Sequence, residues 1–260
     1  MDILNFSANE FKIFILILIR VSIVLFMFPV FSSPVVPGLT KIALALILSL
    51  LLYPVVPMDP GLFPQNNLGF AVLITGEFIV GMVMGYTVDI FFGAVQLAGQ
   101  IIGFQMGFSM INVIDPQSGA NISMMSQIGY LVAILLFILL NGHHTIIQAL
   151  VESFRIVNMG EFFLKAGMIT QLQTMVTGMF VLGIKMAAPA MAALLFTSAA
   201  FGICAKFVPQ MNIMIVAFPV QIYVGLITFG LTLQVIGILS NNFTGTFRGL
   251  LSSLLLWMGG

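Results

Sequence analysis

The sequence predicts an all-α protein made of hydrophobic helical hairpins, with kinked or broken helices, that lies in a membrane or in an assembly that buries it on nearly all sides. Three observations support this prediction. First, 60% of the 260 residues are hydrophobic and only 6% are charged, whereas soluble domains average about 25% charged residues. Second, long apolar runs rich in Leu, Met, Ala and Phe cover most of the chain, and strand patterns are weak. Third, the lengths of these runs do not fit a simple row of membrane spans.

The apolar runs define the expected elements in order. They lie at 13–31, 42–56, 70–92, 95–114, 122–140, 172–205 and 208–239, with a weaker one at 245–257. Turn-forming residues separate most of them, notably between Ser32 and Gly38 and between Pro57 and Asn67. A straight span takes about 20 residues, so 42–56 is short for one span, whereas 172–205 and 208–239 are too long.

Two prolines are expected to divide the long runs. Pro189 lies inside 172–205 and Pro219 lies inside 208–239, and proline removes an internal helical hydrogen bond and clashes with the preceding turn. Irregular backbone is tolerated at bilayer depth only where protein or a water-filled cavity covers it. We therefore expect these helices to pack mainly on other protein, and residues 1–260 to form one domain.

Charge and cysteine usage exclude several functions. The formal net charge is zero and the eight Lys and Arg are scattered, so the chain lacks the basic patch of a nucleic-acid-binding protein. The single cysteine, Cys204, cannot form an internal disulfide or a thiolate cluster. His143 and His144 are adjacent and cannot hold one metal as i, i+4 ligands do. Catalytic and phosphate-binding motifs are missing, so we expect no enzyme, metal or cofactor.

The amino terminus carries no targeting signature. Met1 to Asn5 lacks a positive region, and no Ala-x-Ala site follows the first apolar run. We therefore expect no cleaved signal peptide.

A polar seam interrupts the apolar pattern. Its residues recur at spacings of three or four, so they share one helical face: Asp89, Gly93, Gln96, Gln100, Gly103 and Gly107. A second polar series contains Gln210, Gln221, Gly225, Thr228 and Thr232. Hydrogen bonds between helices or a water-filled lumen would each explain such faces. Glycines four residues apart, such as Gly81 and Gly85, allow two helix backbones to approach closely.

Charged residues also lie inside apolar runs, namely Arg20, Glu77, Asp89 and Lys185. A lone charge at the bilayer centre costs roughly 2.5–3.5 kcal/mol on insertion scales. Each is therefore expected to be paired or to reach a polar boundary, and a relay for ions or protons is the alternative. We expect the buried Lys185 to pair with Glu77 or Asp89.

These residues and several motifs follow one another in a recognisable order. The order includes Arg20, Pro29, Pro34, Pro37 and Lys41, then Glu77-x3-Gly81-x3-Gly85-x3-Asp89-x3-Gly93 and Gln96-x2-Ala98-Gly99-Gln100-x2-Gly103, then Ile114-Asp115-Pro116, Asn141-Gly142-His143, Lys185-x2-Ala188-Pro189, Pro209-Gln210-Met211-Asn212 and Phe218-Pro219. Over essentially the whole chain this order resembles the FliR family of flagellar biosynthetic proteins. The injectisome counterparts of that family are called SctT.

The resemblance implies a subunit of the flagellar type III protein export gate. Such subunits assemble with FliP-like and FliQ-like subunits into a closed, hollow complex, and an FlhB-like protein attaches on the cytoplasmic side. The implied location is the bacterial inner membrane at the flagellar basal body, where the complex meets membrane lipid and passes unfolded export substrates.

The resemblance also implies that one loop projects into the pore and plugs it. On this chain the loop begins with Met106, Gly107, Phe108, Ser109, Met110, Ile111, Asn112, Val113, Ile114, Asp115 and Pro116 and continues to Asn121. Plugs of close relatives carry aromatic residues, whereas Phe108 is the only ring here. Flexible Met and Phe side chains can exclude water and repack around varied substrates. Gly103, Gly107 and Gly119 would let the loop swing aside, and Asp115-Pro116 would fix its turn.

Other functions remain possible from the residues. An injectisome export-gate subunit is the nearest alternative. A secondary transporter of small solutes would also contain broken helices and buried charges, but the chain shows no convincing internal repeat. A structural scaffold without a pore is a further alternative, and 106–121 would then be an ordinary loop between helices.

Overall fold

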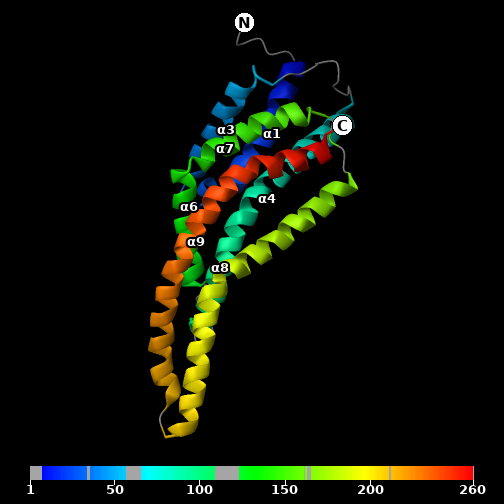
Figure 1. Cartoon of the computed structure of the whole chain (residues 1–260). Coiled ribbons are helices and arrows are strands. Elements are labelled where there is room, and N and C mark those ends of the chain that lie inside the picture. Colours follow the sequence, from blue (N-terminus) through cyan, green and yellow to red (C-terminus); the bar gives the residue numbers. More distant parts are fainter. Residues whose placement is uncertain are drawn as a thin grey trace. The chain divides into compact units, whose positions relative to one another are not determined.

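A computed structural model describes residues 8–33, 36–56, 66–108, 123–160, 162, 165–210 and 212–259. These residues form helices and no strand, which confirms the predicted all-α class. In chain order the helices are α1 (Ala8–Met27), α2 (Pro29–Ser32), α3 (Gly38–Leu52), α4 (Asn67–Gln105), α6 (Met124–Leu139), α7 (Gly142–Ile156), α8 (Ala166–Phe207) and α9 (Ile213–Met258) (Figure 1).

The chain divides into two compact units. Unit 1 contains Met1–Ile90, Asn141–Met175 and Thr244–Gly260, and unit 2 contains Phe91–Leu140 and Val176–Phe243. The long helices α4, α8 and α9 each contribute residues to both units. Each unit therefore has a core built from helices that are distant in the sequence.

The core of unit 1 is centred on α1 and α7. Leu16, Ile17 and Val21 of α1 are fully buried. Helix α7 is amphipathic, because its buried residues recur at spacings of one helical turn, and they include Ile146, Leu150 and Phe154. The apolar runs of the sequence do not include α7, because about half of its residues are polar.

The core of unit 2 contains an aromatic cluster. Phe92 of α4 and Phe137 of α6 pack edge to face with ring centroids 5.6 Å apart, a preferred geometry for aromatic pairs. Phe91 stacks on Phe243 of α9 at 4.5 Å. Ala98 and Ile102 continue the buried face of α4 toward its end.

Pro189 and Pro219 do not divide the two long runs into separate helices. Both prolines lie inside continuous helices, α8 and α9, of 42 and 46 residues. The weak run at 245–257 continues α9 and is not a separate element. One proline removes a single backbone hydrogen bond, and both rings lie on exposed positions where they displace no core side chain. The helices instead break at Phe28, between α1 and α2, and at Asn141, which has a left-handed φ of 57° before α7.

Within unit 2, the end of α8 and the start of α9 form an antiparallel hairpin that is visible in Figure 1. The amide Nε2 of Gln221 on α9 donates a hydrogen bond of 3.2 Å to Ser198 Oγ on α8. This predicted hairpin is therefore held by at least one bond between its two helices.

Several helices are long and apolar enough to cross a membrane. Among the described residues they are Asn67–Gln105, Gly167–Phe207 and Ile215–Phe243, and a fourth span results if α6 and α7 count as one broken span. In their most apolar stretches only 39%, 28% and 22% of residues are buried within the chain. Most of their apolar surface is thus available to lipid or to other protein.

Candidate functional site

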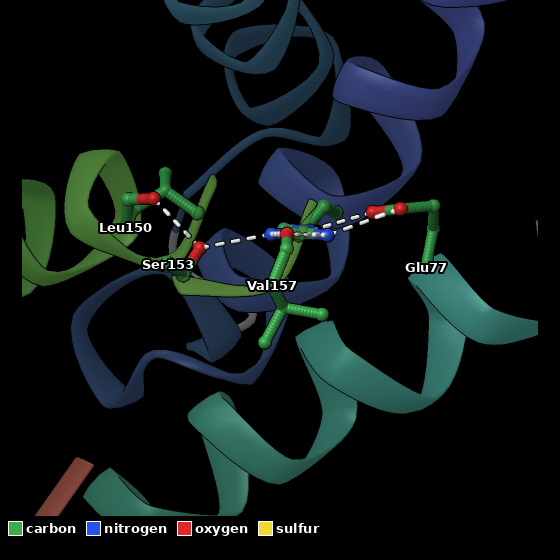
Figure 2. Close-up of polar contacts among 5 residues, drawn as sticks. Glu77, Leu150, Ser153 and Val157 are labelled. Carbon is green, nitrogen blue, oxygen red and sulfur yellow. Dashed lines mark hydrogen bonds and ion pairs between the residues drawn. The ribbon is translucent and has the colours of Figure 1, made fainter. Parts of the chain in front are cut away.

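A buried arginine links three helices of unit 1 (Figure 2). Arg20 of α1 has no exposed surface. Its Nε donates a 2.6 Å hydrogen bond to Glu77 Oε2 on α4, and its Nη2 donates a 3.0 Å bond to Oε1 of the same carboxylate. This bidentate arrangement is the strongest geometry for an arginine–carboxylate pair.

The remaining guanidinium donors reach α7 and its end. Nη1 donates to Ser153 Oγ at 3.2 Å, and both Nη1 and Nη2 donate to the carbonyl of Val157 at 3.3 Å. The guanidinium carbon also lies 4.2 Å from the centre of the Phe154 ring. All five N–H groups of Arg20 therefore have an acceptor in this cluster.

Glycines on α4 bring Glu77 within reach of α1. A Cβ added at Gly81 would lie 3.0 Å from Ile23 Cβ, and one added at Gly85 would lie 2.5 Å from Met27 Cβ. The two backbones can approach this closely only without those side chains. The Arg20 cluster therefore serves to fasten α1, α4 and α7 together.

The predicted pairing of Lys185 with Glu77 is not the one found. Glu77 is occupied by Arg20, as described above. Lys185 is exposed on this chain, as is Asp89, and in the described part of the chain neither forms an ion pair. Lys185 is therefore not one of the buried charges of this chain, and its apolar surroundings are not explained by an internal carboxylate.

The structure divides the polar seam of α4 into a packing part and an exposed part. Gly93 faces Met179 of α8, and Gly99 meets the backbone of α6, where an added Cβ would lie 2.5 Å from Ser126 Cα. Gln96 and Gln100 have exposed side chains. Gly103 packs directly against Ser123, at the start of α6. Gly103 is thus a close-packing residue inside α4, which corrects the expectation that it would act as a hinge.

Helix α4 ends in a Schellman motif. The N–H of Phe108 donates to the carbonyl of Gly103, and the N–H of Gly107 donates to the carbonyl of Phe104, both at 3.1 Å. Gly107 has a φ of +87°, which is the left-handed conformation that this motif needs after the helix. Gly107 therefore determines that α4 ends just before residues 109–122.

The residues on each side of 109–122 are held by neighbouring helices of unit 2. Met106 is fully buried in a notch at Gly225 of α9, and the ring of Phe218 covers Gly107. On the other side, the N–H of Ser123 donates to Gln100 Oε1 at 3.2 Å, and Ser126 Oγ donates to the carbonyl of Gln96 at 3.0 Å. We call these two anchored regions the loop stems. The other predicted plug residues, Ser109 to Pro116, lie outside the described residues.

The second polar series has mixed roles. Gln210 is exposed, and Gln221 bonds α8 as described above. The hydroxyls of Thr228 and Thr232 donate to carbonyls of their own helix at Val224 and Thr228, respectively. Gly225 was grouped with this series in the sequence but provides the notch for Met106. The contact of Phe218 with Gly107 could not be predicted from the residues, except that Phe218 precedes Pro219 in the family motif.

The comparisons with known proteins agree on one family. The profile described as "Bacterial export proteins, family 1" matches residues 11–247. The flagellar biosynthetic protein FliR of Bacillus subtilis (strain 168) is 31% identical over 242 residues, which cover 92% of this chain and 93% of that protein. FliR of Escherichia coli (strain K12) is 31% identical over 210 residues, with 80% and 79% covered. FliR of Aquifex aeolicus is 28% identical over 244 residues, with 93% and 94% covered. The chain belongs to the bacterial export proteins, family 1.

Proposed function

We propose that this chain is the FliR-like subunit of the flagellar type III protein export gate in the bacterial inner membrane, at the flagellar basal body. The observation that carries this proposal is similarity over nearly the full length to proteins named for flagellar biosynthesis. The helices long enough to span a membrane agree with the location. The role is non-enzymatic, since the chain provides surfaces for assembly and a passage for unfolded flagellar proteins.

The chain would perform this role together with FliP-like and FliQ-like subunits, and with an FlhB-like protein on the cytoplasmic side. The small share of α8 and α9 that is buried within the chain supports such an assembly. Apolar helices with kinks and exposed polar groups are stable in a membrane complex when neighbouring subunits cover them.

Genetic replacement tests the flagellar role. The gene is removed from its own organism, and swimming and the amount of flagellin exported to the medium are measured with and without the gene on a plasmid. We expect both to be lost and then restored. Normal swimming and export in the deletion strain would contradict a flagellar role, and loss of injectisome secretion instead would identify the injectisome branch.

We further propose that the loop beginning at Met106 and passing through Ile114-Asp115-Pro116 closes the passage at rest. The loop stems support this proposal, because packing at Met106 and hydrogen bonding at Ser123 fix both ends of the segment on unit 2. Apolar and flexible side chains such as Met110 would exclude water from a narrow passage. Export would displace the segment while its anchored ends stay in place.

Deletion of residues 107–119 tests the plug. With the whole assembly overproduced, we expect the inner membrane to become permeable to small ions and growth to slow. As a control, residues 61–65, which lie outside the proposed plug, are replaced with Gly and Ser. Unchanged ion permeability in the deletion strain, at equal assembly levels, would contradict a plug in this loop.

A further inference from the structure

Lys185 lies near the middle of α8 and is the only charged residue between Lys165 and Lys206. It lies 19 residues after Ala166 and 22 residues before Phe207, so about 30 Å of helix separates it from each end at 1.5 Å per residue. Its side chain is exposed and forms no ion pair with any described residue. A lysine this far from both ends cannot bring its ammonium group to a helix end by stretching along the surface.

The helix beside Lys185 lacks one backbone donor. Pro189 lies four residues further along the same helix and has no N–H to donate to the carbonyl of Lys185. Pro189 and Lys185 are both exposed and lie one turn apart on the same side of the helix. One short stretch of helix therefore combines an exposed charged donor with a missing backbone donor, and this combination favours a polar partner.

The face around Lys185 is shaped to receive a helix. The opposite side of α8 packs on unit 2, where Met186, Ala190 and Leu194 are buried. On the outer side, Gly178 faces open space, because an added Cβ would meet nothing within 4 Å. Ala188 and Ala192 lie on the same side of the helix as Lys185 and Gly178 and are exposed. Small residues in this arrangement let a second helix approach closely in a membrane.

We propose that Lys185 binds, in trans, a carboxylate on an apolar helix of another membrane subunit of the assembly. This inference rests on the proposed function, which places the chain among such subunits. A carboxylate neutralises the ammonium group, and a neighbouring hydroxyl or amide of the same helix can donate to the carbonyl of Lys185. The small residues Gly178, Ala188 and Ala192 on this face let the two backbones approach closely enough for an aspartate or glutamate side chain to reach Lys185.

Charge variants at Lys185 test this pairing in the intact assembly. The tagged chain is produced together with the other export-gate membrane subunits of the same organism and is purified in detergent. We expect Lys185→Arg to recover partner subunits as the natural chain does, Lys185→Met at least five-fold less, and Lys185→Glu almost none. Lys206→Met and Lys206→Glu are matched controls, because Lys206 is exposed in the last turn of the same helix, and we expect normal recovery from both.

A compensating change identifies the partner. Mutants that regain swimming from Lys185→Glu are selected, and we expect an aspartate or glutamate of another membrane subunit to have changed to lysine or arginine. Recovery of partners by Lys185→Glu at the natural level would overturn this inference and leave the proposed function intact. Failure of the natural chain to recover any partner would overturn the proposed function itself.

Photocrosslinking tests the same contact without changing Lys185, so its result does not depend on whether the charge variants fold. A benzophenone amino acid replaces Val181, an exposed neighbour on the same face, while Lys185 is kept. We expect a crosslink to one of the other membrane subunits after illumination of intact cells. Crosslinks to lipid alone would show that the bilayer covers this face, and they would overturn the inference.

Discussion

At the scale of single residues, the Arg20 cluster has the largest energetic consequence. Arg20 and Glu77 are almost completely buried, at 0% and 3% exposure. A buried ion pair gains little over apolar residues of the same size, but removing one partner leaves an uncompensated charge. The cluster therefore specifies how α1, α4 and α7 pack against one another.

We predict that Arg20→Met destabilises the chain by about 3–5 kcal/mol, because Glu77 and the carbonyl of Val157 lose their donors. Thermal unfolding of the purified assembly, followed by proteolysis of this subunit, measures the effect. Arg155→Met is the control, because Arg155 is exposed on α7, and it should change stability little.

The double variant Arg20→Met with Glu77→Met should be more stable than either single variant, because no buried charge is left without a partner. If the two single effects simply added, the ion pair would not be the cause of the loss.

Gly99 of α4, next to the seam residue Gln100, gives a second prediction at this scale. Gly99→Ala should destabilise unit 2 by about 1–3 kcal/mol, because the new Cβ would lie 2.5 Å from Ser126 Cα and 2.7 Å from the carbonyl of Met125. Backbone atoms cannot move aside as a side chain can. Gly230→Ala, at a helical position with open space, should be neutral or slightly stabilising, and the same thermal assay compares the two.

At the scale of the elements, the sequence predicted the helices better than their ends. The apolar runs fall on α1, α3, α4, α6, α8 and α9, but the two runs 70–92 and 95–114 belong to the single helix α4, which ends at Gln105. Pro189 and Pro219 do not interrupt their helices. Each proline ring lies at an exposed position of its helix, where it displaces no core side chain. Helix α7 was missed because its apolar residues form a stripe and not a run.

The end of α4 provides a prediction for an element. Gly107→Ala should destabilise the stem at Met106 by about 1–3 kcal/mol, because a φ of +87° is strained with a Cβ and the ring of Phe218 occupies the space. Faster protease cleavage between α4 and α6 measures this loosening.

Combining Gly107→Ala with Phe218→Leu separates strain from crowding. Removal of the ring should restore part of the protection, and the remainder reports the backbone strain. Cleavage at the natural rate in Gly107→Ala alone would mean that this Schellman motif does not hold the stem.

At the scale of the whole molecule, the family and the helical class followed from the sequence, but the site followed only in part. The order of motifs from Arg20 to Phe218 identified the family, and the glycine spacing of α4 predicted close packing. The partners of individual charges did not follow, because the pairing of Arg20 with Glu77 can be predicted only by knowing which helices meet. The notch that Gly225 forms for Met106 likewise depends on packing between residues that are far apart in the chain.

The central claim is that these apolar helices are covered by other subunits of a membrane complex. Native mass spectrometry of the tagged chain, extracted gently from its own organism, tests this most directly. The account predicts masses that equal this 28.2 kDa chain plus other export-gate subunits. Detection of the chain only alone or only with copies of itself, in cells that export flagellin normally, would contradict the account.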